Sequence, residues 1–366
     1  MKKLVFLFAI VFVSGIAMAQ TTTVSQSNTN ASEAGDNIAD VSQTGSNFVK
    51  ITQVQDIAGS PGGSATVTAV VEQSGTKDNQ IKIEQTHNGT KNNGVSPLSV
   101  FAKQKGGKEN SITQIQLAGG SNWGNVDFSA IQDGNRNVAY QRSYEDAGND
   151  NGAITQKGND NSATQKWHGK NYRDGNVNGE LFIDQKGDDN TATQTFKVGQ
   201  VFSSGLENRG VAQITQKGNG NTATQTQEGA GNAQYLVQNG NNNDASMAAI
   251  GNYNVADAKQ VGNGASLSIT QKQDYMGPAS EGVVADGNSV MISQDGIGSV
   301  ATILQDGLRN TVEGLGGDGT YAINNNGAIL KVTQTGIDNV VQSKQLTGSE
   351  TVSQMGMNNV AIVNQY

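Results

Sequence analysis

The chain alternates apolar and polar residues in short segments that are closed by glycine turns. Residues 212–216 (Ala-Gln-Ile-Thr-Gln) alternate, residues 218–220 (Gly-Asn-Gly) form a turn, and residues 221–225 (Asn-Thr-Ala-Thr-Gln) alternate again. A period of two residues is the pattern of a β-strand, in which successive side chains point to opposite faces. The pattern therefore predicts a strand, a turn and a second strand.

One face of these strands repeats from copy to copy, and the other varies. In this copy the repeated face carries Ala212, Ile214, Gln216, Asn221, Ala223 and Gln225. The variable face carries Thr215, Lys217, Thr222 and Thr224. We therefore expect the repeated face to be the interior of the fold.

A regular spacing of 11 residues joins successive segments. Gln216, Gln227, Gln238, Ala249, Gln260 and Gln271 follow one another at this interval. An 11-residue period is also compatible with a right-handed helical supercoil, but glycine in every period would cost a helix about 1 kcal/mol each time. Two 11-residue arms then make one coil of roughly 22 residues, which predicts an all-β fold, a β-solenoid of stacked strand-turn-strand coils with loop insertions.

The string Gln-x-Gly-x-x-Asn-x-Ala/Val occurs eight times and marks the turns. Its glutamines are Gln132, Gln156, Gln185, Gln216, Gln238, Gln305, Gln334 and Gln354. Its glycines are Gly134, Gly158, Gly187, Gly218, Gly240, Gly307, Gly336 and Gly356, and its asparagines are Asn137, Asn161, Asn190, Asn221, Asn243, Asn310, Asn339 and Asn359. An unpaired buried amide costs roughly 1–3 kcal/mol. Stacking of coils about 4.8 Å apart would let identical amides bond to one another, so we interpret these residues as structural and self-assembly ladders.

The N-terminus has the pattern of an export signal. Lys2 and Lys3 precede an apolar run over residues 4–13, and Ala17-Met18-Ala19 has the small-x-small form of a signal peptidase site. We expect a signal peptide at residues 1–19, a disordered N-terminal leader at residues 20–34 and the solenoid at residues 35–366. The sequence contains no cysteine, so disulfides cannot stabilise the exported protein.

Composition favours repetition over a conventional core. Only 34% of the residues are apolar and 5% aromatic, and the 32 acidic residues outnumber the 24 basic ones. The acidic balance lacks the basic patch with interleaved aromatics that is typical of nucleic-acid binding. We find no nucleophile, acid–base pair or phosphate loop, and therefore expect no enzyme activity and no cofactor.

Longer interruptions fall near residues 56–66, 86–97, 117–128, 142–152, 167–179, 196–208, 273–282 and 313–328. They contain both tryptophans (Trp123, Trp167), both histidines (His87, His168) and all three prolines (Pro61, Pro97, Pro278). We interpret them as loops that project from one or both rims of the stack, with degenerate coils as the alternative for some of them. The isolated histidines lack further metal ligands at the usual spacing, so we predict surface residues and no metal site.

The repeat resembles the curlin repeat of bacterial curli fibre subunits. The closest stretch is residues 352–366, which contains every position of the motif and ends in Gln365-Tyr366. The resemblance covers residues 35–366, although this chain carries large insertions. It implies a secreted structural subunit of extracellular functional amyloid fibres in the biofilm matrix, which acts in adhesion.

The same resemblance implies the partners. They are the chain itself as a homopolymer, a second curlin-like subunit and an outer-membrane secretion pore of the curli type. The alternative is a non-polymerising β-solenoid adhesin or an ice-binding protein, for which Thr191-Ala192-Thr193 and Thr222-Ala223-Thr224 offer a short threonine array. Val138 and Tyr140 occupy the matching positions in another copy, so ordinary β-propensity explains the threonines better.

Overall fold

The structure is a computed structural model that describes residues 9–13, 20–28, 36–58, 66–90, 98–119, 126–144, 149–168, 177–197, 208–229, 231–273, 287–315 and 320–365. All regular secondary structure in these ranges is β-strand, and they contain no helix that could cross a membrane. The chain divides into two compact units, Met1–Gln185 and Lys186–Tyr366. Each unit is described by itself below.

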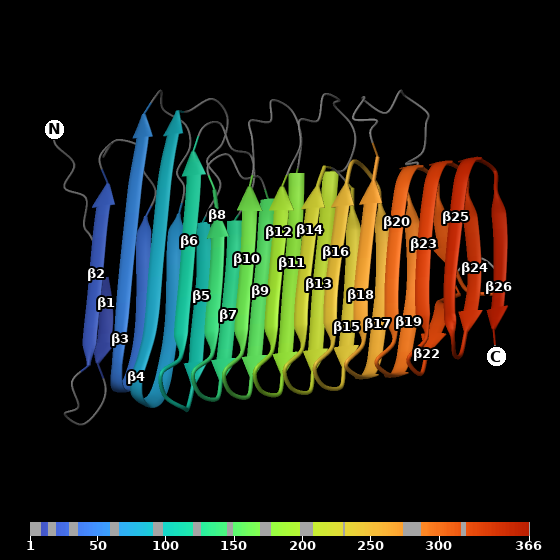
Figure 1. Cartoon of the computed structure of the whole chain (residues 1–366). Coiled ribbons are helices and arrows are strands. Elements are labelled where there is room, and N and C mark those ends of the chain that lie inside the picture. Colours follow the sequence, from blue (N-terminus) through green and yellow to red (C-terminus); the bar gives the residue numbers. More distant parts are fainter. Residues whose placement is uncertain are drawn as a thin grey trace. The chain divides into compact units, whose positions relative to one another are not determined.

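Unit 1 contains eleven strands among its described residues (Figure 1). They are β1 (Ala9–Val13), β2 (Thr21–Asn28), β3 (Asn37–Ala58), β4 (Val67–Thr90), β5 (Leu98–Lys105), β6 (Ser111–Gly119), β7 (Val126–Asp133), β8 (Val138–Ser143), β9 (Asn149–Lys157), β10 (Ser162–His168) and β11 (Val177–Lys186), whose last residue belongs to unit 2.

The strands of unit 2 continue the numbering. They are β12 (Thr191–Lys197), β13 (Asn208–Lys217), β14 (Thr222–Glu228), β15 (Ala233–Asn239), β16 (Asp244–Ile250), β17 (Val255–Asn263), β18 (Ser266–Lys272), β19 (Ser289–Ile297), β20 (Val300–Leu308), β21 (Thr311–Glu313), β22 (Ala322–Asn325), β23 (Ile329–Ile337), β24 (Val340–Gln345), β25 (Ser349–Met357) and β26 (Val360–Gln365).

Each coil consists of a first arm, a turn and a second arm. In unit 1, first arm β7 pairs in parallel with first arm β9, and second arm β8 pairs with second arm β10. In unit 2, β13 pairs with β15, and β14 pairs with β16. Strands therefore pair with the equivalent arm of the next coil, which confirms the predicted β-solenoid.

The predicted interior face is also confirmed. Ala212, Ile214, Gln216, Asn221, Ala223 and Gln225 are all buried, whereas Lys217 and Thr222 are exposed. The register keeps equivalent residues above one another, as in the pairs Gln132–Gln156 and Ala130–Ile154 of unit 1. The core is thus a set of columns that run through the stack.

The motif glycine is required because coils approach closely at the turn. Gly134 has φ +128°, and a Cβ at this position would lie 1.8 Å from the carbonyl oxygen of Gly158 in the next coil. Gly240 has φ +133°, and its Cβ would lie 1.7 Å from the oxygen of Gly262. Side chains are excluded both by the backbone conformation and by the neighbouring coil.

The N-terminal residues differ from what the sequence predicts. Residues 21–28 form β2, which pairs in register with the second arm of β3, although we expect a disordered leader there. Alternation over these residues, from Thr22 through Val24 to Gln26, matches the second arms and explains the pairing. The strand β1 lies inside the predicted signal peptide and pairs with the first arm of β3. The signal peptide itself stays a prediction.

The expectation that Trp167 lies in a projecting loop is wrong. Trp167 is the sixth residue of β10, is 1% exposed, and its ring stacks on Phe128 with centroids 4.6 Å apart. A Cβ on Gly152 would lie 2.3 Å from the Trp167 ring, so glycine makes the space for it. In unit 2, Gly210 faces the buried ring of Phe196 in the same way.

The histidines are likewise not loop residues. His168 ends β10, and its ring stacks on Tyr144 with centroids 4.0 Å apart. His87 lies within β4.

Trp123, Pro61, Pro97 and Pro278 lie outside the described residues. Between β2 and β11, the stretches outside the described residues all fall between a second arm and the next first arm.

We predict that alanine is tolerated very differently at two turn glycines. Gly240→Ala should strongly lower the urea concentration at half-unfolding, because its Cβ would collide with the backbone of the next coil. Gly264→Ala is the matched control, since Gly264 has φ +67° with no atom within 4 Å of its Cβ position. The free energy of unfolding of the control should fall by only about 1–2 kcal/mol, because alanine must adopt the left-handed conformation. Equal losses in the two variants would contradict the close approach.

Candidate functional site

The motif glutamines of unit 1 form a continuous hydrogen-bonded column. Gln43 donates to Gln73 (3.1 Å), Gln73 to Gln104 (2.7 Å) and Gln104 to Gln132 (3.0 Å). Gln132 then donates to Gln156, and Gln156 donates to Gln185, both over 2.8 Å. Their side chains are buried. Gln43, Gln73 and Gln104 precede turns of irregular length, so the column continues through turns that depart from the motif.

Unit 2 contains two such columns, one at each turn of the coil. The first runs from Gln216 through Gln238 and Gln260 to Gln294, with bonds of 2.8, 2.8 and 3.0 Å. The second runs from Gln271 through Gln305 and Gln334 to Gln354, with bonds of 3.0, 2.9 and 2.9 Å. The structure therefore separates Gln216 and Gln238 from the later motif glutamines, a division that the shared motif does not reveal.

All of these glutamines donate in the same direction, toward the C-terminal neighbour. The backbone fixes this direction, because from Gln104 onward each Nε2 also donates to a main-chain carbonyl, which can only accept. Gln132 Nε2 donates to Ser111 O (3.0 Å), and Gln238 Nε2 donates to Thr222 O (2.9 Å). Exchange of the amide oxygen and nitrogen would place oxygen against oxygen, so the column has one defined orientation.

The motif asparagines form columns of the opposite direction. Asn137 Nδ2 donates to Asn110 Oδ1 (3.3 Å) and to Gly158 O (2.7 Å), and the Asn137 backbone N–H also donates to Asn110 Oδ1 (3.0 Å). Each asparagine therefore links its turn to the coil before and to the coil after. Asn161 continues this column in unit 1. In unit 2 one column joins Asn190, Asn221 and Asn243, and another joins Asn232, Asn254, Asn288, Asn310, Asn339 and Asn359.

A further glutamine column lies in the middle of the second arms and was not predicted as a ladder. In unit 1, Gln114 donates to Gln141 and Gln141 donates to Gln165, both over 2.8 Å. The preceding coil has Ile83 at this position. Since Ile83 has no donor, the buried Gln114 Oε1 has no hydrogen-bond partner.

The same rule accounts for other unpaired oxygens. Gln271 follows Ala249 in its column, Gln227 follows Phe196, and the Oε1 atoms of Gln271 and Gln227 have no partner. Gln114, Gln227 and Gln271 start their columns and lack a donor from the preceding coil, so each leaves one unsatisfied acceptor. Gln43 also starts a column, but its Oε1 accepts a hydrogen bond from the Thr22 hydroxyl (2.7 Å).

Ion pairs connect the tips of successive turns. The Arg136 side chain forms two hydrogen bonds with Asp160 (2.6 and 2.5 Å), and Arg309 forms the same pair with Asp338 (2.6 and 2.8 Å). The guanidinium of Arg136 holds the pKa of Asp160 below its ordinary value through the hydrogen bond, and Arg309 does so for Asp338. Because these carboxylates are exposed, the pairs align the turns and contribute little to stability.

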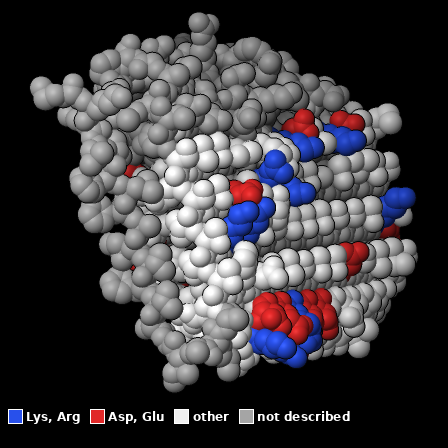
Figure 2. Space-filling model, turned by 90° about the vertical axis from the view of Figure 1, so that its left-hand side faces the viewer, with Lys and Arg blue, Asp and Glu red and all other residues white. Residues whose placement is uncertain are grey.

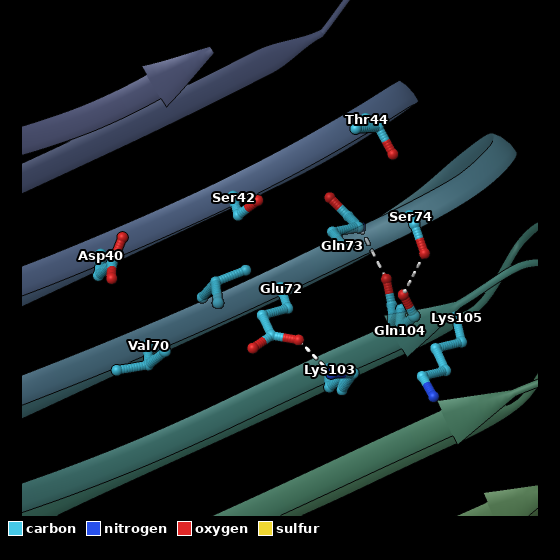
Figure 3. Close-up of a pocket in the computed structure, with 11 residues that line it drawn as sticks. Asp40, Ser42, Thr44, Val70, Glu72, Gln73, Ser74, Lys103, Gln104 and Lys105 are labelled. Atoms are coloured by element: carbon cyan, nitrogen blue, oxygen red, sulfur yellow. Dashed lines mark hydrogen bonds and ion pairs between the residues drawn. The ribbon is translucent and has the colours of Figure 1, made fainter. Parts of the chain in front are cut away.

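The described surface also carries charged groups away from the turns. A groove of about 400 Å³ on the outer face of β3, β4 and β5 contains the ion pair of Glu72 with Lys103 beside Asp40 and Lys105 (Figure 3). Figure 2 shows charged side chains in small mixed groups on the face that it presents. Among the described residues no group of three or more His, Cys, Asp or Glu could hold a metal ion. The threonine array ends where Thr222 and Thr224 are followed by Asp244 and Ser246.

The last strands of unit 2 leave the solenoid open. In the described part of the chain no strand pairs with the far edge of β25 or β26. Val360 and Ile362 of β26 are 65% and 67% exposed, and Met355 of β25 is 82% exposed. Gln354 and Asn359 are the last members of their columns. The end of the stack thus presents strand edges and column ends together.

No family model matches this chain, and no curated protein matches it. The candidate site therefore rests on the geometry of the ladders and of the open end.

We predict that Gln238→Ala destabilises unit 2 through its neighbours. The change leaves the buried Gln260 Oε1 without a donor, at a cost of roughly 1–3 kcal/mol, whereas Gln216 Nε2 keeps the carbonyls of Thr191 and Asn221 as acceptors. Gln238→Met keeps the volume and should lose only the hydrogen-bond contribution. Urea unfolding of the purified chain measures the loss of stability in both variants.

The matched control for this test is Gln213→Ala, because Gln213 is exposed on the neighbouring strand β13. Its unfolding midpoint should stay within experimental error of the unchanged chain. A similar loss in Gln213→Ala and Gln238→Ala would show that the ladder bond is not responsible.

Proposed function

We propose that this protein is a structural subunit of extracellular curli-like amyloid fibres, which assembles end to end through its strands. The observation that carries the proposal is the open C-terminal edge, where in-register strands and amide columns stop without a cap among the described residues. An exposed edge of this kind is a template for another strand. The function is therefore assembly itself.

The ladders support this function through their energetics. Every coil added to the stack supplies the donors and acceptors that the preceding coil lacks, as in the bonds from Gln305 to Gln334 and on to Gln354. The same vertical registry of amides stabilises cross-β fibres. A chain with few aromatic residues gains order in this way without a large apolar core.

The setting follows from the N-terminal pattern and from the resemblance to curlin repeats. We propose export by way of residues 1–19, passage through an outer-membrane pore of the curli type, and a place in the biofilm matrix at the cell surface. The partners are further copies of the chain and a second curlin-like subunit. The function requires no cofactor and no enzyme activity.

The purified chain that starts at Gln20 should form fibres after a lag. Thioflavin fluorescence should rise slowly without seeds, and preformed fragments should abolish the lag, because an existing edge replaces the slow first stack. Fibre diffraction should give a meridional reflection near 4.8 Å. A chain that folds cooperatively and stays monomeric would contradict the proposal and favour the alternative of a solenoid adhesin.

Substitutions at the open end should slow assembly. Gln354→Ala and Asn359→Ala each remove the last amide of a column, so an incoming strand meets one bond fewer and the seeded elongation rate falls. Ser353→Ala is the matched control, because Ser353 directly precedes Gln354 and lies on the exposed face of β25. Elongation at the same rate in all three variants would show that the columns do not guide addition.

A further inference from the structure

The two ends of the chain terminate in different halves of a coil. At the end of unit 2, β26 is a first arm that pairs with first arm β24, while the second arms end at β25. At the start of unit 1, β2 is a second arm that pairs with the second arm of β3. Without residues 1–19, β2 has no first arm in its own coil. The two halves complement each other.

The inward residues of the two ends match at all but one pair, Glu350 of β25 and Thr22 of β2. Asn359, Ala361, Val363 and Gln365 at the C-terminal end match Asn37, Ala39, Val41 and Gln43 of β3. Thr351-Val352-Ser353-Gln354 of β25 matches Thr23-Val24-Ser25-Gln26 of β2. A stack that passes from one copy to the next would therefore place alanine on alanine, valine on valine and glutamine on glutamine. Register in parallel sheets is set by such matches of the inward face.

The hydrogen bonds of Gln26 indicate a missing donor. Its Nε2 donates to Gln53 Oε1 (2.7 Å), but its own Oε1 is buried from solvent and has no partner. It is the starting glutamine of a column, like Gln114. Gln354 ends its column, and its Nε2 points in the direction in which all the glutamines donate. The N–H of Gln354 on one copy fits the free oxygen of Gln26 on the next.

The strand β1 occupies the place that this contact requires. Residues 9–13 pair in parallel with Ala39–Gln43, the edge that matches β26. Both strands cannot lie on that edge at once. Residues 9–13, while attached, thus cover the edge with a strand from the same chain.

We propose that a second copy of this chain joins at a half-coil lap joint. Its β26 takes the place of β1 on the first arm of β3, and its β25 pairs with β2, so that β26 of one copy and β2 of the other complete one coil. Removal of residues 1–19 exposes the joint, and the attached segment acts as a cap. This inference rests on the proposed fibre function and specifies its contact and register.

One outward pair also fits the same register. Val360 is 65% exposed and would lie beside Ile38, which is 42% exposed. The joint would bury apolar surface of both side chains that is otherwise exposed to water, which favours association. Outside the joint these apolar side chains remain in solvent.

A disulfide tests the register directly, because the sequence has no cysteine. In the chain that starts at Gln20 we combine Ser25→Cys with Ser353→Cys, two exposed positions that the joint places side by side. In-register parallel neighbours lie about 4.8 Å apart, within the Cα separation that a disulfide accepts. Oxidised fibres, dissolved without reductant, should give a ladder of covalent oligomers and a linked peptide pair of residues 25 and 353.

The matched control combines Ser27→Cys with Ser353→Cys, since residue 27 is exposed on the same face but two positions out of register. This control should form fibres but give no ladder of covalent oligomers. Fibres of the first variant without the 25–353 link would overturn the lap joint and leave the fibre function standing. Failure of all variants and of the unchanged chain to form fibres would overturn both.

The cap is tested with the same cysteine pair in the full chain from Met1. We expect loss of the 25–353 link there, because β1 holds the edge of β3. Cross-linking of the full chain to the same extent as of the chain from Gln20 would overturn the cap while retaining the joint.

Discussion

The structure depends on one constraint, that a buried amide must find a partner. Interiors usually satisfy it by excluding Gln and Asn, but here the interior is rich in both. The coils meet the constraint by repetition, since a glutamine above a glutamine supplies a donor and an acceptor for the same geometry. Parallel pairing in register, the fixed turn and the small inward residues all serve to keep equal amides above one another.

Within one column of the core, some coils carry an apolar residue and others carry a glutamine. The middle column of the second arms passes from Ile51 and Ile83 to Gln114 in unit 1, and from Gln225 to Met247 and Ile269 in unit 2. These side chains have similar length, so the spacing of the arms is kept. The change costs one unpaired oxygen at each start of a glutamine run, as at Gln114, and longer runs therefore lower the cost per coil.

The sequence was sufficient to predict the coil and its inward face, because alternation and the 11-residue period depend on neighbours in the chain. It failed at Trp167, whose burial depends on the space left by Gly152 in the facing arm. A large side chain in one arm is here matched by a glycine in the facing arm. Such a match leaves no periodic pattern in the sequence. The division of the motif glutamines between two turns was also hidden, since both turns use the same string.

The direction of the amides at the C-terminal end has a consequence for the symmetry of any assembly. The column that ends at Gln354 presents an N–H group there. A copy turned end for end would set one such donor end against another, with no rotamer to relieve it, because the Val340 carbonyl also holds Gln354 Nε2. Assemblies with a two-fold axis across the stack are therefore disfavoured. A filament of this chain would be polar, with two chemically distinct ends.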